Sequence, residues 1–331
     1  MSWFEELTGF RETSPEQVRN NLTLDDETLV SNANGRRLVC GRLETPALSE
    51  LRRWVQPGEQ EASRITLREV LANVQALHAD PANAGALFQV ASQFNLLEMA
   101  SPSATPEQGV GIYENDPTQG PACAVAAGAG TIYRNYFAPL SGRTGQSADN
   151  QIDCLADLGV ALGNTGNRLW QMRNGYALAS RDGLLEIAER LRDSSASDLD
   201  ALRGLLRIGL QWETQVTLPG CTHRVSQAYC SALPVAYSSH PANLWESFAR
   251  LVLEAAYEAT LCAAVLNRQS TGNRRAFLTL LGGGAFGNQP EWIMDALRRA
   301  LRLYAAWDLE VAIVSYRSHN PGLQALVEQF P

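Results

Sequence analysis

The sequence contains no lysine, so arginine supplies all 27 of its basic residues. A chain without lysine cannot form a Schiff base with a carbonyl substrate. It also lacks the lysine that holds phosphate groups in Walker-type and kinase sites. Both classes of enzyme are therefore excluded.

Positive charge and long apolar runs are also scarce. The net charge is -8, whereas a protein that binds the nucleic-acid backbone needs a basic surface. No run approaches the ~20 apolar residues that span a bilayer, and the opening residues MSWFEELTGF lack the basic and apolar regions of a signal peptide. We therefore expect no nucleic-acid or membrane partner. We expect a cytoplasmic location, or secretion into a host cell by a route that is not readable from the sequence.

Metal-binding and nucleophile motifs are missing as well. The six cysteines are scattered, without the close paired spacing of a zinc site or a disulfide framework. Cys221, His223 and Cys230 have no fourth partner at a convincing spacing, and no G-x-S-x-G motif occurs. We predict no metal and no cofactor.

The order of the expected elements indicates an α/β fold. We expect strands at 36–44, 85–95, 206–218, 223–238 and 309–316, and helices at 45–55, 65–79, 151–164, 182–192, 196–206 and 243–266. Alternating strands and helices are typical of layered α/β proteins. The sheet can be mixed, because the strands at 206–218 and 223–238 can pair antiparallel. The final strand, helix and strand should form a parallel crossover unit.

The stretch FLTLLGGGAFGNQPEWIMDALRRAL, residues 277–301, predicts a buried strand, a glycine turn and an amphipathic helix. Glycine leaves the backbone open to close approach by a ligand. A helix N-terminus adds unpaired N–H groups and a positive dipole end, which suit a phosphate. Phe286 adds a flat apolar surface that a nucleotide or ribose would use. The turn therefore predicts a site for a nucleotide diphosphate.

Two other interpretations of this turn are open. Gly282, Gly284 and Gly287 formally match G-x-G-x-x-G, the dinucleotide-binding motif. That motif requires an acidic residue at the end of the next strand, but the remaining strand ends in Ser315-Tyr316-Arg317. Alternatively, the glycines serve only tight packing of the strand against the helix.

Three motifs carry a resemblance to a known family. GGGAFGN followed by PEWI resembles the diphosphate loop of macrodomains, especially the branch related to poly(ADP-ribose) glycohydrolase. FQVASQFN, residues 88–95, resembles their other ligand loop, where a strand ends in an asparagine that contacts ribose. YENDPTQGPACA, residues 113–124, lies where they carry a catalytic acidic loop. Together the motifs are similar to bacterial effector hydrolases that remove ADP-ribose from arginine of ubiquitin.

The resemblance implies a macrodomain-like three-layer α/β/α sandwich with a mixed central sheet. This catalytic domain would span 36–331, follow an N-terminal extension at 1–35, and carry a helical insertion around 140–205. The implied activity is removal of mono-ADP-ribose from a modified protein, with ADP-ribose or an ADP-ribosylated protein such as ubiquitin as the partner. A non-catalytic ADP-ribose reader and an NAD or nucleotide-sugar processing enzyme are the alternatives.

The glycohydrolase signature of three glycines and Gln-Glu-Glu is missing, and Thr118-Gln119-Gly120-Pro121 stands in that region. The family's catalytic glutamates therefore cannot be carried over. Cleavage at the anomeric carbon passes through an oxocarbenium-like state, which a carboxylate assists by activating water or stabilising positive charge. The catalytic candidates are Glu114, Asp116, Gln119 and Glu98. The candidates for binding ADP-ribose are Asn95, Gln93, Gly282, Gly283, Gly284, Ala285, Phe286, Gly287, Asn288 and His319.

Several acidic residues, including two of these candidates, also have an ordinary structural explanation. Glu114 and Asp116 could simply form a turn in a loop rich in proline and glycine. Glu254 and Glu258 share one side of an apolar helix, where we expect them to pair with arginines such as Arg250.

Overall fold

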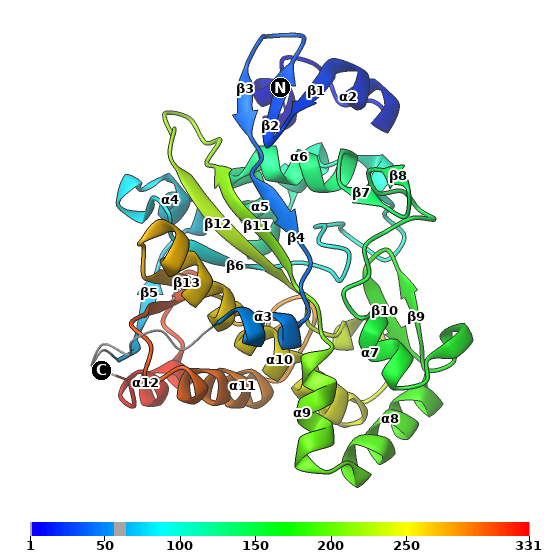
Figure 1. Ribbon diagram of the computed structural model, residues 1–331. Coiled ribbons are helices and arrows are strands. Elements are labelled where there is room, and N and C mark those ends of the chain that lie inside the picture. The colour runs from blue at the N-terminus through cyan, green and yellow to red at the C-terminus, as the bar shows by residue number, and fades with distance from the viewer. Residues whose placement is uncertain (1, 56–63, 331) are drawn as a thin grey trace.

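The computed structural model describes residues 2–55 and 64–330, and it is built around a seven-stranded sheet in the order β4-β11-β12-β6-β13-β14-β5 (Figure 1). The strands are β4 (Arg42–Glu44), β11 (Gly209–Gln215), β12 (Arg224–Cys230), β6 (Leu87–Ala91), β13 (Arg275–Leu278), β14 (Glu310–Ser315) and β5 (Thr66–Leu71). The strands from β12 to β5 are parallel neighbours, whereas β11 pairs antiparallel with both β12 and β4. The predicted mixed α/β sheet is confirmed.

Helices cover both faces of this sheet. On one face α10 (Ala242–Thr271) packs on β12, β6 and β13, and the helices around it are α3 (Leu48–Trp54), α8 (Arg181–Asp193), α9 (Ala196–Gly204) and α11 (Pro290–Leu303). On the other face lie α4 (Val74–Ala79), α5 (Gln119–Ala126) and α6 (Gly128–Tyr136). Successive side chains of β6 point to opposite faces of the sheet. Gln89 donates to Thr260 of α10 on one face, whereas Phe88 stacks on His78 of α4 on the other. The three-layer arrangement is therefore confirmed.

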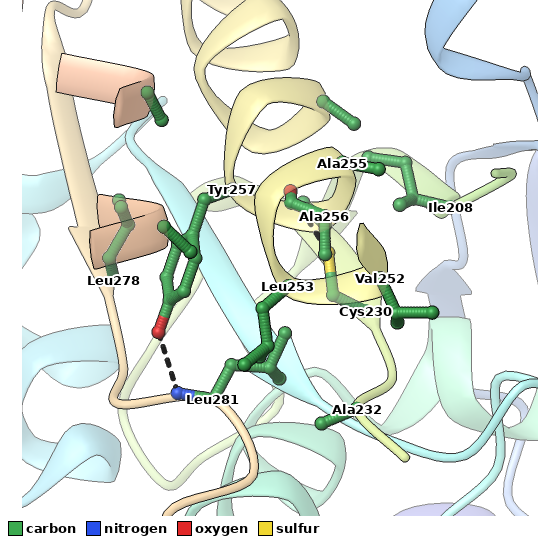
Figure 2. Packing of buried hydrophobic residues seen from close by; sticks show 14 of the residues in the cluster. Ile208, Cys230, Ala232, Val252, Leu253, Ala255, Ala256, Tyr257, Leu278 and Leu281 are labelled. Atoms are coloured by element: carbon green, nitrogen blue, oxygen red, sulfur yellow. Dashed lines mark hydrogen bonds between the residues drawn. The ribbon is translucent and has the colours of Figure 1, made fainter. Parts of the chain in front are cut away.

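Helix α10 fixes the end of β13 (Figure 2). Alanine occurs repeatedly on its buried face, which allows a close approach to the sheet. The Tyr257 hydroxyl donates to the Thr279 carbonyl and accepts from the Leu281 N–H, both at 2.8 Å. The chain is thus held rigidly just before the glycine turn.

The strand β13, helix α11 and strand β14 form the expected parallel crossover unit. Helix α11 starts with Pro290 in its first turn, and it buries one apolar stripe, made by Trp292, Ile293, Ala296, Leu297, Ala300 and Leu301. The hydrophobic pattern predicted this helix correctly.

The single helix expected at 65–79 is wrong. Residues Thr66–Leu71 form the edge strand β5, and α4 begins at Val74, with Asn73 as its N-cap. Ile65 and Leu67 are buried at a spacing of two residues, which is the period of a strand, whereas the apolar residues at 67, 70, 71 and 74 follow the helical spacing. The helix expected at 151–164 is also shorter and spans only α7 (Ala156–Ala161).

The N-terminal residues form a small layer of their own above α6 in Figure 1. It contains α1 (Trp3–Thr8), α2 (Pro15–Asn21) and an antiparallel sheet of β1 (Leu22–Asp25), β2 (Thr28–Ser31) and β3 (Arg37–Val39). Because β3 pairs with β2, this layer continues past residue 35.

The segment at 140–205 contains a hairpin, β9 (Trp170–Arg173) and β10 (Tyr176–Ala179), in addition to the helices α7, α8 and α9. The described helices include none that is both long and apolar enough to cross a membrane.

Candidate functional site

A cavity of about 250 Å³ opens beyond the carboxyl ends of β6, β12 and β13. Parallel strands end at the same edge of a sheet, where ligands of open α/β sheets bind. Of the predicted site residues, those that line the cavity are Gln93, Glu98, Asp116, Gln119, Gly282, Gly284, Ala285 and Phe286. The structure therefore brings three segments together that lie far apart in the sequence.

Glu98 is the most unusual group in this cavity. Its exposed fraction is 5%, and its Oε1 atom is buried without a hydrogen-bond partner in the described part of the chain. Burial raises the pKa of this carboxyl well above its usual value, nearby Asp116 raises it further, and Arg134 opposes the shift. Glu98 therefore keeps its proton at a higher pH than an ordinary glutamate, and it can act as a proton donor inside the cavity.

The motif Thr118-Gln119-Gly120-Pro121 makes room for Glu98. A Cβ atom on Gly120 would collide with the Glu98 carboxylate and with the Ala91 carbonyl. Gln119 fixes this position, because its Oε1 accepts from the Ala91 N–H at 2.9 Å and its Nε2 donates to the Gln89 carbonyl at 2.8 Å. Both ends of the Gln119 side-chain amide thus bind the backbone of β6 and hold α5 against the end of this strand.

Asp116 supplies the second carboxylate. It is partly buried at the cavity wall, and its Oδ1 accepts from the Thr118 N–H at 2.9 Å. Its Oδ2 accepts no hydrogen bond from the residues that the structure describes. The site thus combines a buried carboxyl that holds a proton with a more accessible carboxylate, a pairing suited to acid and base roles.

The glycine turn contains two kinds of glycine. Gly282 and Gly287 adopt positive φ angles of 76° and 71°, and a Cβ atom on either would strike Ala232 or Ala236. Gly284 differs, because a Cβ atom there would meet nothing within 4 Å. Packing explains the first two glycines but leaves Gly284 unexplained.

Gly284, Ala285 and Phe286 present consecutive backbone N–H groups that donate to no other group in ranges 2–55 and 64–330. Gly284 and Ala285 are exposed, and all three residues line the cavity. Successive unpaired N–H groups form a concave site for an anion. The cavity lining stops before the first residue of α11, so the turn itself supplies these donors.

Three aromatic side chains form an apolar wall. Phe286, Tyr176 and Tyr237 contact one another with ring centroids 5.0 to 5.5 Å apart. The Tyr176 hydroxyl donates to the Met99 carbonyl at 2.8 Å, which fixes its ring. The wall suits a sugar or a flat ring.

Neither Tyr176 nor Tyr237 was predicted from the sequence. The sequence Asn174-Gly175 between two short runs is typical of a β-hairpin turn, so this signal could have placed Tyr176 on a hairpin. The position of that hairpin over the cavity depends on tertiary packing.

The remaining predicted residues support the loops and do not line the cavity. Exposed Glu114 accepts the Trp3 N–H at 2.9 Å, and buried Asn95 donates to Gln151 at 2.9 Å. His319 pairs with Glu69 at 2.8 Å. The others are Gly283, Gly287 and Asn288. The Asn288 Nδ2 donates to the Leu233 carbonyl at 2.8 Å. Their contact with a ligand stays a prediction.

The acidic pair on α10 meets arginines, as expected, but different ones. Glu258 accepts from Arg52 and Arg299, and Glu254 accepts from Arg203. Arg250 instead pairs with Glu246, Glu291 and Asp295.

No protein-family model and no curated protein matches the sequence. The structure is similar to the poly(ADP-ribose) glycohydrolase of Deinococcus radiodurans in complex with ADP-ribose, with 12% identity and a TM-score of 0.46 over 96% of this chain and 100% of that chain. The Thermomonospora curvata enzyme gives 12% identity and a TM-score of 0.46, with 96% of each chain covered. Bound to the inhibitor ADP-HPD, it gives 13% identity and a TM-score of 0.44 over 95% of this chain and 96% of that chain. At such identity no residue role transfers, so the roles below rest on the cavity.

Proposed function

We propose that this protein is an ADP-ribosyl hydrolase, which cleaves the bond between the anomeric carbon of ADP-ribose and a carrier. One observation carries the proposal: a buried carboxyl without a partner, Glu98, and the free N–H groups of Gly284, Ala285 and Phe286 line the same cavity. The motif resemblance supplies the identity of the ligand.

The free N–H groups would hold the pyrophosphate, and the aromatic wall would pack against the adjoining ribose. Anchoring the rest of ADP-ribose makes the attack of water on the anomeric carbon nearly intramolecular. In this pose the scissile bond lies toward Glu98 and Asp116.

The two carboxyl groups would divide the chemistry. Protonated Glu98 donates its proton to the leaving atom of the carrier as the glycosidic bond breaks. Asp116, as a carboxylate, takes a proton from water or stabilises the oxocarbenium-like positive charge while the water oxygen bonds to the anomeric carbon. The products are free ADP-ribose and the unmodified carrier group.

We further propose that the substrate is mono-ADP-ribose on a protein arginine, as on ubiquitin. The three motifs resemble hydrolases of that linkage, and the Gln-Glu-Glu signature of poly(ADP-ribose) cleavage is missing from the sequence. Release of ADP-ribose from arginine-modified protein, compared with release from poly(ADP-ribose), tests this preference. Equal turnover of both substrates would contradict it.

Release of free ADP-ribose from a modified protein tests the activity itself. We expect Asp116→Asn to lower turnover by at least about a hundredfold, because a positioned acid or base contributes about 10² to 10⁴-fold. Glu114→Gln is the matched control on the same loop, since glutamine keeps an acceptor for the Trp3 N–H. If wild type binds ADP-ribose without releasing it from any carrier, the reader function replaces the hydrolase.

A further inference from the structure

The N-terminal extension holds the loop that precedes Asp116. The Trp3 Nε1–H donates to the Val110 carbonyl at 3.3 Å, and the Trp3 backbone N–H donates to Glu114 at 2.9 Å. Phe4 and Leu7 belong to the same buried cluster as Val110 and Tyr113. The extension therefore shares a core with this loop.

Glu12 makes the most specific of these contacts. Its Oε1 accepts from the Val110 N–H at 3.0 Å and from the Tyr136 hydroxyl at 2.6 Å, and its Oε2 accepts from the Gly111 N–H at 2.7 Å. These amides begin the 3-10 helix η3 (Gly111–Asn115). A carboxylate at the start of a helical turn satisfies its free N–H groups, and here the carboxylate comes from 98 residues earlier in the chain.

The loop is shaped around this carboxylate. A Cβ atom on Gly109 would lie 2.5 Å from the Glu12 Oε2 atom, and a Cβ atom on Gly111 would lie 2.8 Å from it. Gly109 also adopts a positive φ of 86°. Both glycines are therefore explained by the approach of Glu12.

The same loop contacts both acids of the site. The Tyr113 hydroxyl accepts from the Glu98 N–H at 3.0 Å, and the Asp116 N–H donates to the Tyr113 carbonyl at 3.2 Å. Leu97 and Met99, on either side of Glu98, lie in the cluster that contains Phe4 and Leu7. Contacts thus run from Glu12 through the loop to Glu98 and Asp116.

We propose that Glu12 is a positioning residue for catalysis and that the N-terminal extension is part of the catalytic unit. This inference rests on the hydrolase function proposed above. Removal of the Glu12 carboxylate would loosen the loop and misplace both acids. The glycine turn would keep its ligand contacts, because Tyr257 and Asn288 hold it independently.

The test compares Glu12→Gln with Glu16→Gln, an exposed glutamate on α2. Glutamine in place of Glu12 turns an NH₂ group toward N–H donors. We expect kcat for ADP-ribose release to fall about tenfold to a hundredfold, as for a small misplacement of reacting groups. The Kd for free ADP-ribose should change less than about twofold, and Glu12→Asp, which keeps the charge, should recover part of kcat.

Amide hydrogen exchange gives a readout that does not depend on activity. In Glu12→Gln we expect faster exchange at 93–100 and 109–117 only, and in Glu16→Gln no change. The proposal would be overturned by an unchanged kcat, by a loss of ADP-ribose affinity as large as the loss of kcat, or by faster exchange throughout the chain. If wild type has no hydrolase activity, the proposed function fails separately, and unchanged exchange at 93–100 would still overturn the positioning role.

Discussion

Two buried glutamates, Glu98 in the cavity and Glu258 on α10, are used in different ways. Glu98 and Glu258 have exposed fractions of 5% and 3%. Glu258 of α10 accepts hydrogen bonds from Arg52 and Arg299, and Arg52 also pairs with Asp200. Glu98 faces a cavity with one oxygen unpartnered among the described residues.

The difference separates a structural carboxylate from a functional one. A buried charge normally carries partners that offset its desolvation, as Glu258 does. A buried polar atom without a partner needs another explanation, and a ligand that completes its hydrogen bonds is the simplest one. Glu258 therefore serves stability, whereas Glu98 is available for chemistry.

Replacing each glutamate by glutamine should have opposite effects on turnover and on stability. We expect Glu98→Gln to lower turnover about 10² to 10⁴-fold, the range for losing a general acid. Glu258→Gln should leave turnover per folded molecule unchanged but cost about 3 kcal/mol of unfolding free energy, because the arginines lose a buried partner. Urea unfolding and kcat, measured on both variants, check this, and the reverse pattern would contradict it.

The two neighbouring glycines, Gly284 and Gly283, sharpen the account of the turn. Gly284→Val should weaken ADP-ribose binding about tenfold or more, equal to about 1.4 kcal/mol, because the side chain would stand over the free N–H groups. Stability should stay within about 0.5 kcal/mol, since a Cβ atom at residue 284 meets nothing within 4 Å.

Gly283→Ala is the control, because its Cβ atom would lie 3.1 Å from the Ile293 Cδ1 atom and Gly283 does not line the cavity. Calorimetric titration with ADP-ribose distinguishes the two variants. Equal affinity of Gly284→Val and wild type would remove the turn from the site.

The pH dependence of stability tests the protonated state of Glu98. The pKa of Glu98 is raised from 4.5 in the folded state, so the unfolded chain loses this proton first as pH rises. Above about pH 4.5, wild type should therefore lose stability relative to Glu98→Gln, by at most about 1.4 kcal/mol per pH unit until the folded pKa is reached.

Burial lowers the pKa of His78 to about 4, but this residue is common to both proteins, so its contribution cancels. Urea unfolding at several pH values between 4.5 and 8 gives the difference. A difference that does not grow with pH would show that Glu98 is ordinarily ionised in the fold.

The sequence predicted local features well. The apolar stripe of α11, the antiparallel pair β11 and β12, and the glycine turn all depend on neighbouring residues, whose spacing is visible directly. The strand β5 was missed because the apolar residues at 67, 70, 71 and 74 follow the helical spacing, and only the buried pair at 65 and 67 follows the extended one.

The candidate site was predicted less completely. Glu114 and Asp116 lie two residues apart in one loop. Only the fold shows that Asp116 lines the cavity, while Glu114 accepts a hydrogen bond from Trp3. Glu98 was one candidate among several acids. Its burial without a hydrogen-bond partner is set by groups that are distant in the sequence, so the sequence alone does not reveal it. Tyr237 follows from no local pattern for the same reason.

A crystal structure of Glu98→Gln with ADP-ribose tests whether the glycine turn and residue 98 bind one ligand together. The account predicts pyrophosphate oxygens within hydrogen-bond distance of the N–H groups of Gly284, Ala285 and Phe286, and the anomeric carbon beside residue 98 and Asp116. A nucleotide bound outside this cavity, or bound in reverse with its adenine at residue 98, would contradict it.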